Sequence, residues 1–198
     1  MLQLSQIKTA PNQLTLLRLV FIPFIVGGII EGNYERALIL LIIAGVSDAL
    51  DGLLARALQQ KTLLGQYLDP IADKLLLSTL FLVLALEHRV PWRVTTVVFS
   101  RDLLIIVVST LVYVTTSLRD FSPSIWGKMN TASEIGAVFF VILAQVADTL
   151  WVTHASIVLL WLTFILTVIS GLHYILLLDR RLKGETGAHQ EPPQGVQK

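Results

Sequence analysis

Only one long apolar stretch of this sequence is free of charged residues. Residues 149–178 contain no Asp, Glu, Lys or Arg, and they exceed the ~20 residues that a membrane-spanning helix needs. The other apolar stretches are shorter, and each reaches a spanning length only if it continues through charged neighbours. They cover 19–30, 37–47, 75–86, 103–118 and 135–147. The sequence therefore predicts an all-α, polytopic membrane protein whose helices carry charges at membrane depth, where charges are costly and functional.

The composition supports this class. Apolar residues make up 54% of the 198 residues, and charged residues make up 15%, compared with ~25% in an average soluble chain. The mean hydropathy is +0.71. A formal net charge of +1 excludes nucleic-acid binding through a broad basic face. The absence of cysteine excludes a disulfide framework, a thiolate nucleophile and a cysteine-ligated metal.

Six spanning helices are predicted when each apolar stretch is extended through its charged neighbours. They cover 14–30, 36–57, 67–86, 91–116, 124–147 and 152–178. The first is expected to be a retained span and not a secretory signal, because no small-residue cleavage site follows it. We expect residues 1–180 to form one membrane domain. Residues 181–198 are polar and contain Gly and Pro, so we expect them to form a disordered tail.

The distribution of Lys and Arg predicts that both termini lie in the cytoplasm. In this orientation the outer side holds Arg36, Arg89 and Arg93. The inner side holds Lys8, Arg56, Lys61, Arg119, Lys128, Arg180, Arg181, Lys183 and Lys198. The charges within the spans then all fall on the cytoplasmic half. The sequence therefore predicts a multi-pass protein of the inner membrane with one polar chamber open to the cytoplasm.

Segment 47–78 carries four aspartates at helical spacing. Asp48 and Asp51 lie three residues apart on one predicted helix, and Asp69 and Asp73 lie four apart on the next. Because the connection between these helices is short, we expect them to be antiparallel neighbours whose carboxylates face one another. The same faces also carry Gly52, Ala55, Arg56 and Gly65.

Four carboxylates at close quarters need positive charge to remain ionised. Arg56 and Lys74 do not balance them, whereas hard divalent cations such as Mg²⁺, Mn²⁺ or Ca²⁺ do. A two-metal site suits the binding of a pyrophosphate and the stabilisation of charge in phosphoryl transfer. Two other interpretations stay open. Single acids could cap helices, as Asp69 before Pro70 could, and paired intramembrane acids could serve an ion-coupled transporter.

The spacing Asp48-x2-Asp51-Gly52-x2-Ala55-Arg56-x8-Gly65-x3-Asp69-x3-Asp73 resembles the signature of the CDP-alcohol phosphatidyltransferase family. Segment 12–23 resembles the opening of that family, and segments 100–102 and 127–131 resemble its bacterial phosphatidylglycerophosphate synthase and cardiolipin synthase branches. Only the polar tail falls outside the resemblance. It implies a six-helix membrane fold, a homodimer, and transfer of a phosphatidyl group from CDP-diacylglycerol to an alcohol with release of CMP.

The resemblance also implies roles for individual residues. Asp48, Asp51, Asp69 and Asp73 would hold two Mg²⁺ or Mn²⁺ ions, and Asp73 would in addition be the general base. The cytidine nucleotide would be bound by Gly52, Ala55, Arg56, Gly65, Asn12 and Thr15. Asn12 and Thr15 could instead cap the first helix.

The remaining intramembrane cations suit an anionic acceptor. Arg18, Arg101 and Lys128 fall at the cytoplasmic ends of their predicted helices, and the arginine fork matches phosphate oxygens. Glycerol 3-phosphate is therefore the favoured acceptor and phosphatidylglycerophosphate the product. Phosphatidylglycerol as acceptor, giving cardiolipin, is the alternative within the family. An ion-coupled transporter or a non-catalytic scaffold is the alternative outside it.

These cations could instead be structural. Arg101 could pair with an acid of a neighbouring helix, and Lys128 could extend to the membrane surface. Glu134 is the one intramembrane acid outside the signature, and we expect it to pair with Arg101 or Lys128.

Overall fold

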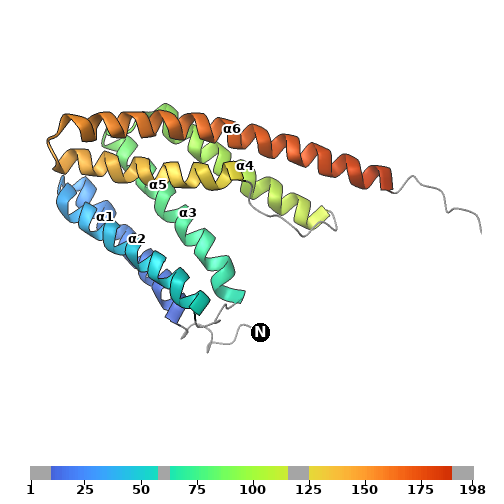
Figure 1. The fold of residues 1–198 in the computed structure, drawn as a ribbon, viewed down its shortest axis with the longest axis horizontal. Coiled ribbons are helices and arrows are strands. Elements are labelled where there is room, and N and C mark those ends of the chain that lie inside the picture. Colours follow the sequence, from blue (N-terminus) through green and yellow to red (C-terminus); the bar gives the residue numbers. More distant parts are fainter. Residues whose placement is uncertain (1–9, 58–62, 116–124, 189–198) are drawn as a thin grey trace, which may run out of the picture.

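A computed structural model shows that the described chain is built from six helices (Figure 1). It describes the backbone over 10–57, 63–115 and 125–188, and side chains over 17–50, 72–107 and 125–176. Within these ranges there is no strand. The helices are α1 (Ala10–Ile30), α2 (Tyr34–Ala57), α3 (Leu63–Leu86), α4 (Trp92–Thr115), α5 (Ile125–Val146) and α6 (Leu150–Ala188).

The predicted all-α class, and the number and order of the helices, are confirmed over the described residues. The largest difference is at the end of α6, where helical backbone continues over 181–188, within the segment expected to be a disordered tail. This stretch contains Leu, Lys, Arg and Glu, which favour helix, and two glycines, which do not; the first proline after it is Pro192. Residues 189–198 lie outside the described residues.

The helices form two arms that meet at one end of the molecule (Figure 1). α1 packs against α2 and α3 in one arm, and α6 packs against α4 and α5 in the other. Contacts of α5 with α2 and α3 join the arms. The core lies at this junction and includes Ile25, Ile29, Leu80, Phe81, Leu84, Val138 and Ile142.

The turn between α1 and α2 holds these helices close together. Gly32 has a φ of +73°, a conformation that glycine adopts without strain. The Asn33 side chain accepts a hydrogen bond of 3.1 Å from the backbone N–H of Arg36 and so caps α2. A Cβ atom at Gly28 would lie 3.2 Å from the Cβ atom of Ala37, closer than ordinary van der Waals contact, so the close packing of the two helices favours glycine here.

Much of the outer surface is apolar. Large apolar side chains are exposed on every helix, among them Phe24, Ile43, Leu75, Leu103, Ile135 and Val158. By length and composition, two helical segments of the described chain could cross a membrane, Ile125–Val146 and Leu150–Leu176, and Leu17–Ile30 is a shorter apolar helix. The other helices carry the charges that the sequence places inside their apolar stretches.

Candidate active site

The first polar cluster centres on Arg18 of α1. Its Nη1 atom donates to Asp73 Oδ1 on α3, and its Nη2 atom donates to Asp48 Oδ1 on α2. The arginine side chain is 3% exposed, whereas the two aspartates are 46% and 50% exposed. One buried guanidinium therefore holds two half-exposed carboxylates from different helices on the same side of the bundle.

This cluster corrects one expectation about the helices. The sequence predicts α2 and α3 as direct neighbours, but over the described residues each packs mainly against α1. Two helices that present aspartates to each other repel unless a cation lies between those side chains. Arg18 supplies that cation, and α1 contacts both helices.

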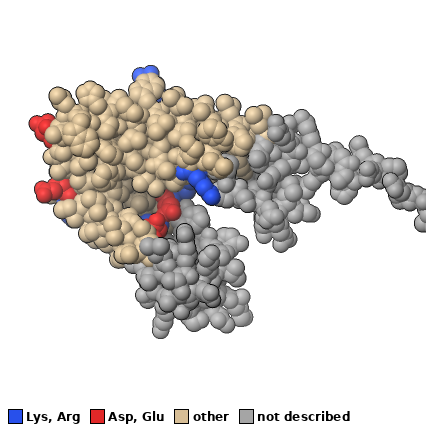
Figure 2. All heavy atoms as spheres, in the orientation of Figure 1, with Lys and Arg blue, Asp and Glu red and all other residues tan. Residues whose placement is uncertain are grey.

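The cluster opens into a groove of about 520 Å³ between α1, α2, α3 and α5. The polar side chains that line it are Arg18, Asp48, Asp73 and Thr131. Its remaining walls are mostly apolar and include Leu41, Ile42, Val46, Leu76, Ile135 and Phe139. In Figure 2, acidic and basic side chains meet in the recess between the two arms, while the surrounding surface of this view is almost free of charge. The groove can thus accept a molecule with a charged head and a hydrocarbon body.

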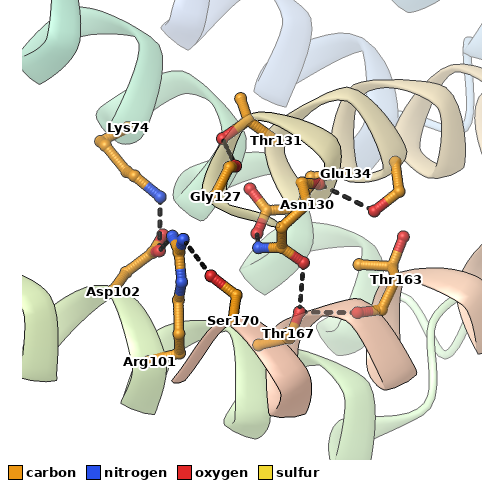
Figure 3. A network of polar contacts seen from close by, with 11 residues as sticks. Lys74, Arg101, Asp102, Gly127, Asn130, Thr131, Glu134, Thr163, Thr167 and Ser170 are labelled. Atoms are coloured by element: carbon orange, nitrogen blue, oxygen red, sulfur yellow. Dashed lines mark hydrogen bonds and ion pairs between the residues drawn. The ribbon is translucent and has the colours of Figure 1, made fainter. Parts of the chain in front are cut away.

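A second polar cluster lies on α3, α4 and α6 (Figure 3). Asp102 Oδ1 accepts hydrogen bonds from Lys74 Nζ and, at 2.8 Å, from Arg101 Nη1. Arg101 Nη2 also donates to Ser170 Oγ at 2.8 Å. Asp102 and Arg101 are each 8% exposed, and Lys74 is 31% exposed. Asp102 therefore connects α4 to Lys74 on α3, the residue directly after Asp73, and Arg101 connects α4 to α6.

A third cluster joins α5 to α6 (Figure 3). Asn130 Nδ2 donates to Glu134 Oε1 at 2.6 Å, and Thr167 Oγ1 lies 2.9 Å from Asn130 Oδ1 and 2.7 Å from the backbone oxygen of Thr163. Glu134 is fully buried, and its Oε2 atom has no hydrogen-bond partner. The expectation that Glu134 pairs with Arg101 or Lys128 is wrong, because its contact is with the amide of Asn130 one helical turn earlier.

The structure brings together some of the predicted site residues. Asp48, Asp73 and Arg18 meet at one point. Arg101 is buried in the second cluster, and Lys128 is exposed without an ion pair to any described residue. The other predicted residues fall on α1, α2 and α3, but their side chains lie outside the described residues. They are Asn12, Thr15, Asp51, Gly52, Ala55, Arg56, Gly65 and Asp69.

The acids with described side chains do not complete a metal site by themselves. No group of three or more potential ligands gathers among the side chains described over 17–50, 72–107 and 125–176. Asp48 and Asp73 are the two members of the predicted set that can be placed. They offer hard oxygen ligands that converge on one cationic group, which is the ligand chemistry that Mg²⁺ and Mn²⁺ prefer.

Sequence reasoning missed two partnerships. It assigned Arg18 to the acceptor and counted Lys74 among the cations near the four aspartates, but Arg18 binds the aspartates and Lys74 binds Asp102. A signal for the second partnership was present, because Asp102 follows Arg101 directly in a stretch that is otherwise apolar. The contacts of Arg18 with the aspartates depend on how α1 packs between other helices, and the spacing of residues within one helix does not reveal this packing.

Comparison with known proteins decides the family. The family model described as CDP-alcohol phosphatidyltransferase matches residues 8–169. This chain belongs to the CDP-alcohol phosphatidyltransferase family. The four helices that form the groove, α1, α2, α3 and α5, lie within the matched region.

Curated relatives of this phosphatidyltransferase carry two kinds of name. A protein of Haemophilus influenzae named CDP-diacylglycerol–glycerol-3-phosphate 3-phosphatidyltransferase is 32% identical over 83% of this chain and 90% of its own length. A probable phosphatidylglycerophosphate synthase of Mycobacterium tuberculosis is 32% identical over 86% of this chain and 82% of its own length. A probable cardiolipin synthase (CMP-forming) of Drosophila melanogaster is 28% identical over 87% of this chain and 58% of its own length.

Proposed function

We propose that this phosphatidyltransferase transfers the phosphatidyl group of CDP-diacylglycerol to glycerol 3-phosphate, giving phosphatidylglycerophosphate and CMP. The convergence of Asp48 and Asp73 at the charged end of an apolar groove carries the proposal. These residues are the first and last acids of the family signature, and relatives that match most of this chain are named for this reaction. Family membership favours the enzyme over the ion-coupled transporter.

The proposed metal ligands are Asp48, Asp51, Asp69 and Asp73. The pairing of Asp48 and Asp73 with one guanidinium supports this assignment, because carboxylates that share a monovalent cation are close enough to share a metal site. Bound Mg²⁺ or Mn²⁺ would neutralise the pyrophosphate and stabilise the charge that develops on departing CMP. The half-exposed state of both carboxylates leaves them accessible from the groove.

In the proposed reaction Asp73 accepts the proton of the acceptor hydroxyl. The hydroxyl oxygen then attacks the β-phosphorus of CDP-diacylglycerol, and the bond between that phosphorus and the oxygen of CMP breaks. Asp73 is a suitable base because its carboxylate lines the groove and is held in place by Arg18. An apolar wall beside these charges suits the acyl chains of the donor.

The proposed nucleotide ligands are Gly52, Ala55, Arg56, Gly65, Asn12 and Thr15, and the proposed acceptor ligands are Arg18, Arg101 and Lys128. Arg18 is buried and donates to Asp48 and Asp73 through its two Nη atoms, so a role in acceptor binding requires that it contact the acceptor in addition to these partners. Arg101 is engaged with Asp102 and Ser170, so a role for it requires that it contact the acceptor in addition to these partners.

We also propose that the enzyme spans the inner membrane six times as a homodimer, with both termini and the site on the cytoplasmic side. The apolar outer surface supports embedding in lipid, since exposed apolar area of this extent is rare on soluble monomers. The excess of Lys and Arg in the predicted inner loops supports the orientation.

Cardiolipin synthesis is the second candidate, and the Drosophila melanogaster relative favours it. The test is CMP release from CDP-diacylglycerol by the purified protein with Mg²⁺ or Mn²⁺, in the presence of glycerol 3-phosphate, phosphatidylglycerol, inositol phosphate or serine. We expect glycerol 3-phosphate to give the fastest release and Asp51→Ala to abolish release with every acceptor. Stimulation by phosphatidylglycerol alone would favour the second candidate, and no metal-dependent release with any acceptor would contradict both.

A further inference from the structure

A second cavity, of about 430 Å³, lies at the opposite end of α3 from the candidate active site. It is bounded by the turn between α3 and α4, the beginning of α4, the end of α5 and the first half of α6. His88 in this turn lies roughly 20 Å from Asp73 along the axis of α3, at about 1.5 Å per helical residue. The cavity is therefore separate from the groove that holds the aspartates.

The inside of this cavity is mainly apolar. Val94, Val141, Leu160, Trp161 and Phe164 line it, together with the polar side chains of His88 and Gln145. Two hydroxyls in the wall are bonded to their own helix: Ser156 donates to the backbone oxygen of Thr153 at 2.8 Å, and Thr153 donates to that of Thr149 at 3.4 Å. The interior can therefore hold a hydrocarbon chain, and its two hydroxyl groups are not available to donate to a polar ligand.

The rim of the cavity is positively charged. Arg89 and Arg93 line it, and neither forms an ion pair with an acid among the described residues. The Nε atom of Arg89 donates to Tyr34 Oη at 3.2 Å, and its guanidinium lies 5.4 Å from the centre of that ring. These contacts position the guanidinium of Arg89 without neutralising its charge.

The backbone at the rim adds to this positive charge. α4 begins at Trp92, and its first turn contains no acidic residue but does contain Arg93. The amino-terminal end of a helix carries partial positive charge and unpaired N–H groups, so an arginine there is unfavourable unless an anion is nearby. In the predicted orientation Arg89 and Arg93 lie on the outer side of the membrane, whereas Lys and Arg are favoured on the cytoplasmic side. Their presence here is therefore not explained by the orientation of the chain.

We propose that this cavity binds an anionic phospholipid, with an acyl chain between α4, α5 and α6 and the phosphate between Arg89, Arg93 and the start of α4. The apolar interior favours a lipid over free phosphate, and the charged rim favours an anionic over a zwitterionic headgroup. The exposed Trp161 and Ile157 continue the apolar wall to the outer surface, where a lipid could enter. This site depends on the proposed membrane embedding but not on the proposed catalytic roles.

The test is lipid binding by the full chain in neutral detergent, measured by native mass spectrometry. Phosphatidylglycerol and phosphatidylcholine with identical acyl chains are titrated against the wild type and the double variant Arg89→Gln/Arg93→Gln. We expect the wild type to prefer phosphatidylglycerol. Each arginine near a membrane surface contributes about fivefold toward anionic lipid, so the double variant should lose roughly 25-fold in affinity for phosphatidylglycerol.

Arg36→Gln is the matched control, because Arg36 is an exposed arginine near the same end whose partner is Glu31 and which does not line this cavity. It should keep the wild-type preference. Ala144→Leu should also weaken phosphatidylglycerol binding, because Ala144 lines the cavity and the added carbons occupy the space for the acyl chain while both arginines remain.

Equal phosphatidylglycerol binding by the wild type and the double variant would overturn the proposal. So would unchanged binding by Ala144→Leu, since the chain would then not occupy the cavity. Competition by inorganic phosphate at the same concentration as the lipid would indicate a site for a free anion and would also overturn it. Because binding is read directly, loss of CMP release, which tests the proposed function, leaves these outcomes unaffected.

Discussion

Asp48 and Asp102 are both paired with an arginine, yet their surroundings differ. Asp48 is half exposed at the edge of a groove, while its partner Arg18 is buried. Asp102 is buried with Arg101 and also binds Lys74. An acid that faces a groove can exchange its partner for a ligand, whereas a buried acid with two cationic partners fixes the helices that carry them. The difference separates the proposed chemistry from the scaffold that supports it.

Among variants of residues whose side chains the structure describes, Asp73→Asn should give the largest effect. It keeps the size of the side chain and removes the proposed base, so the rate of CMP release should fall about 10²–10⁴-fold, the usual contribution of general-base catalysis. The measurement is turnover with saturating CDP-diacylglycerol and glycerol 3-phosphate. CDP-diacylglycerol should still bind, and near-normal turnover in this variant would contradict the assignment of Asp73.

Asp102→Asn should act mainly on stability. Removal of the carboxylate leaves Arg101 buried beside Lys74 without an anion, which costs about 3 kcal/mol of unfolding free energy. The melting temperature should fall by about 6–12 °C, at 2–4 °C for each kcal/mol in a chain of this size. Turnover measured below the melting temperature should fall far less than in Asp73→Asn. An equal loss of turnover would mean that the two aspartates do not differ in role.

Arg18→Gln should lower stability less than Asp102→Asn does, and by an amount that depends on metal. Because Asp48 and Asp73 are half exposed, loss of their shared cation should cost about 1 kcal/mol without metal. Added Mg²⁺ should reduce the difference in melting temperature from the wild type, since a divalent cation supplies the missing charge.

The exposed Arg36, paired with Glu31, provides the control for this measurement. Arg36→Gln should change the melting temperature little and respond to Mg²⁺ as the wild type does. If Mg²⁺ stabilises Arg18→Gln no more than it stabilises Arg36→Gln, Arg18 does not compensate the charge of a metal site.

The helices could be predicted from sequence because their boundaries depend on local features. The apolar stretches end at charges, at Gly32 or at Pro91, and the structure keeps those limits within a few residues. The sequence predicts that the last span ends at 178 and that a disordered tail follows, whereas the helical backbone of α6 continues to Ala188. Polarity marks the edge of a membrane segment and does not by itself end a helix.

The candidate site was predicted in part. The spacing of Asp48 and Asp73 on their helices indicated that they serve one site, and the structure brings them to one guanidinium. The position of Arg18 between them could not be predicted, because it depends on the packing of α1 against two helices. The contact of Glu134 with Asn130 could be predicted from the sequence, since side chains four residues apart on one helix are neighbours and an amide can donate to a carboxylate.

The close approach of Gly28 to Ala37 has a consequence for how a bulky substrate enters. At this end a side chain at position 28 would crowd Ala37, so α1 and α2 are held in close contact there. Arg18 and Asp48 lie ten or more residues from this contact. If α1 and α2 move apart to admit a lipid headgroup, the spacing between them should therefore change more around Asp48 than at Gly28.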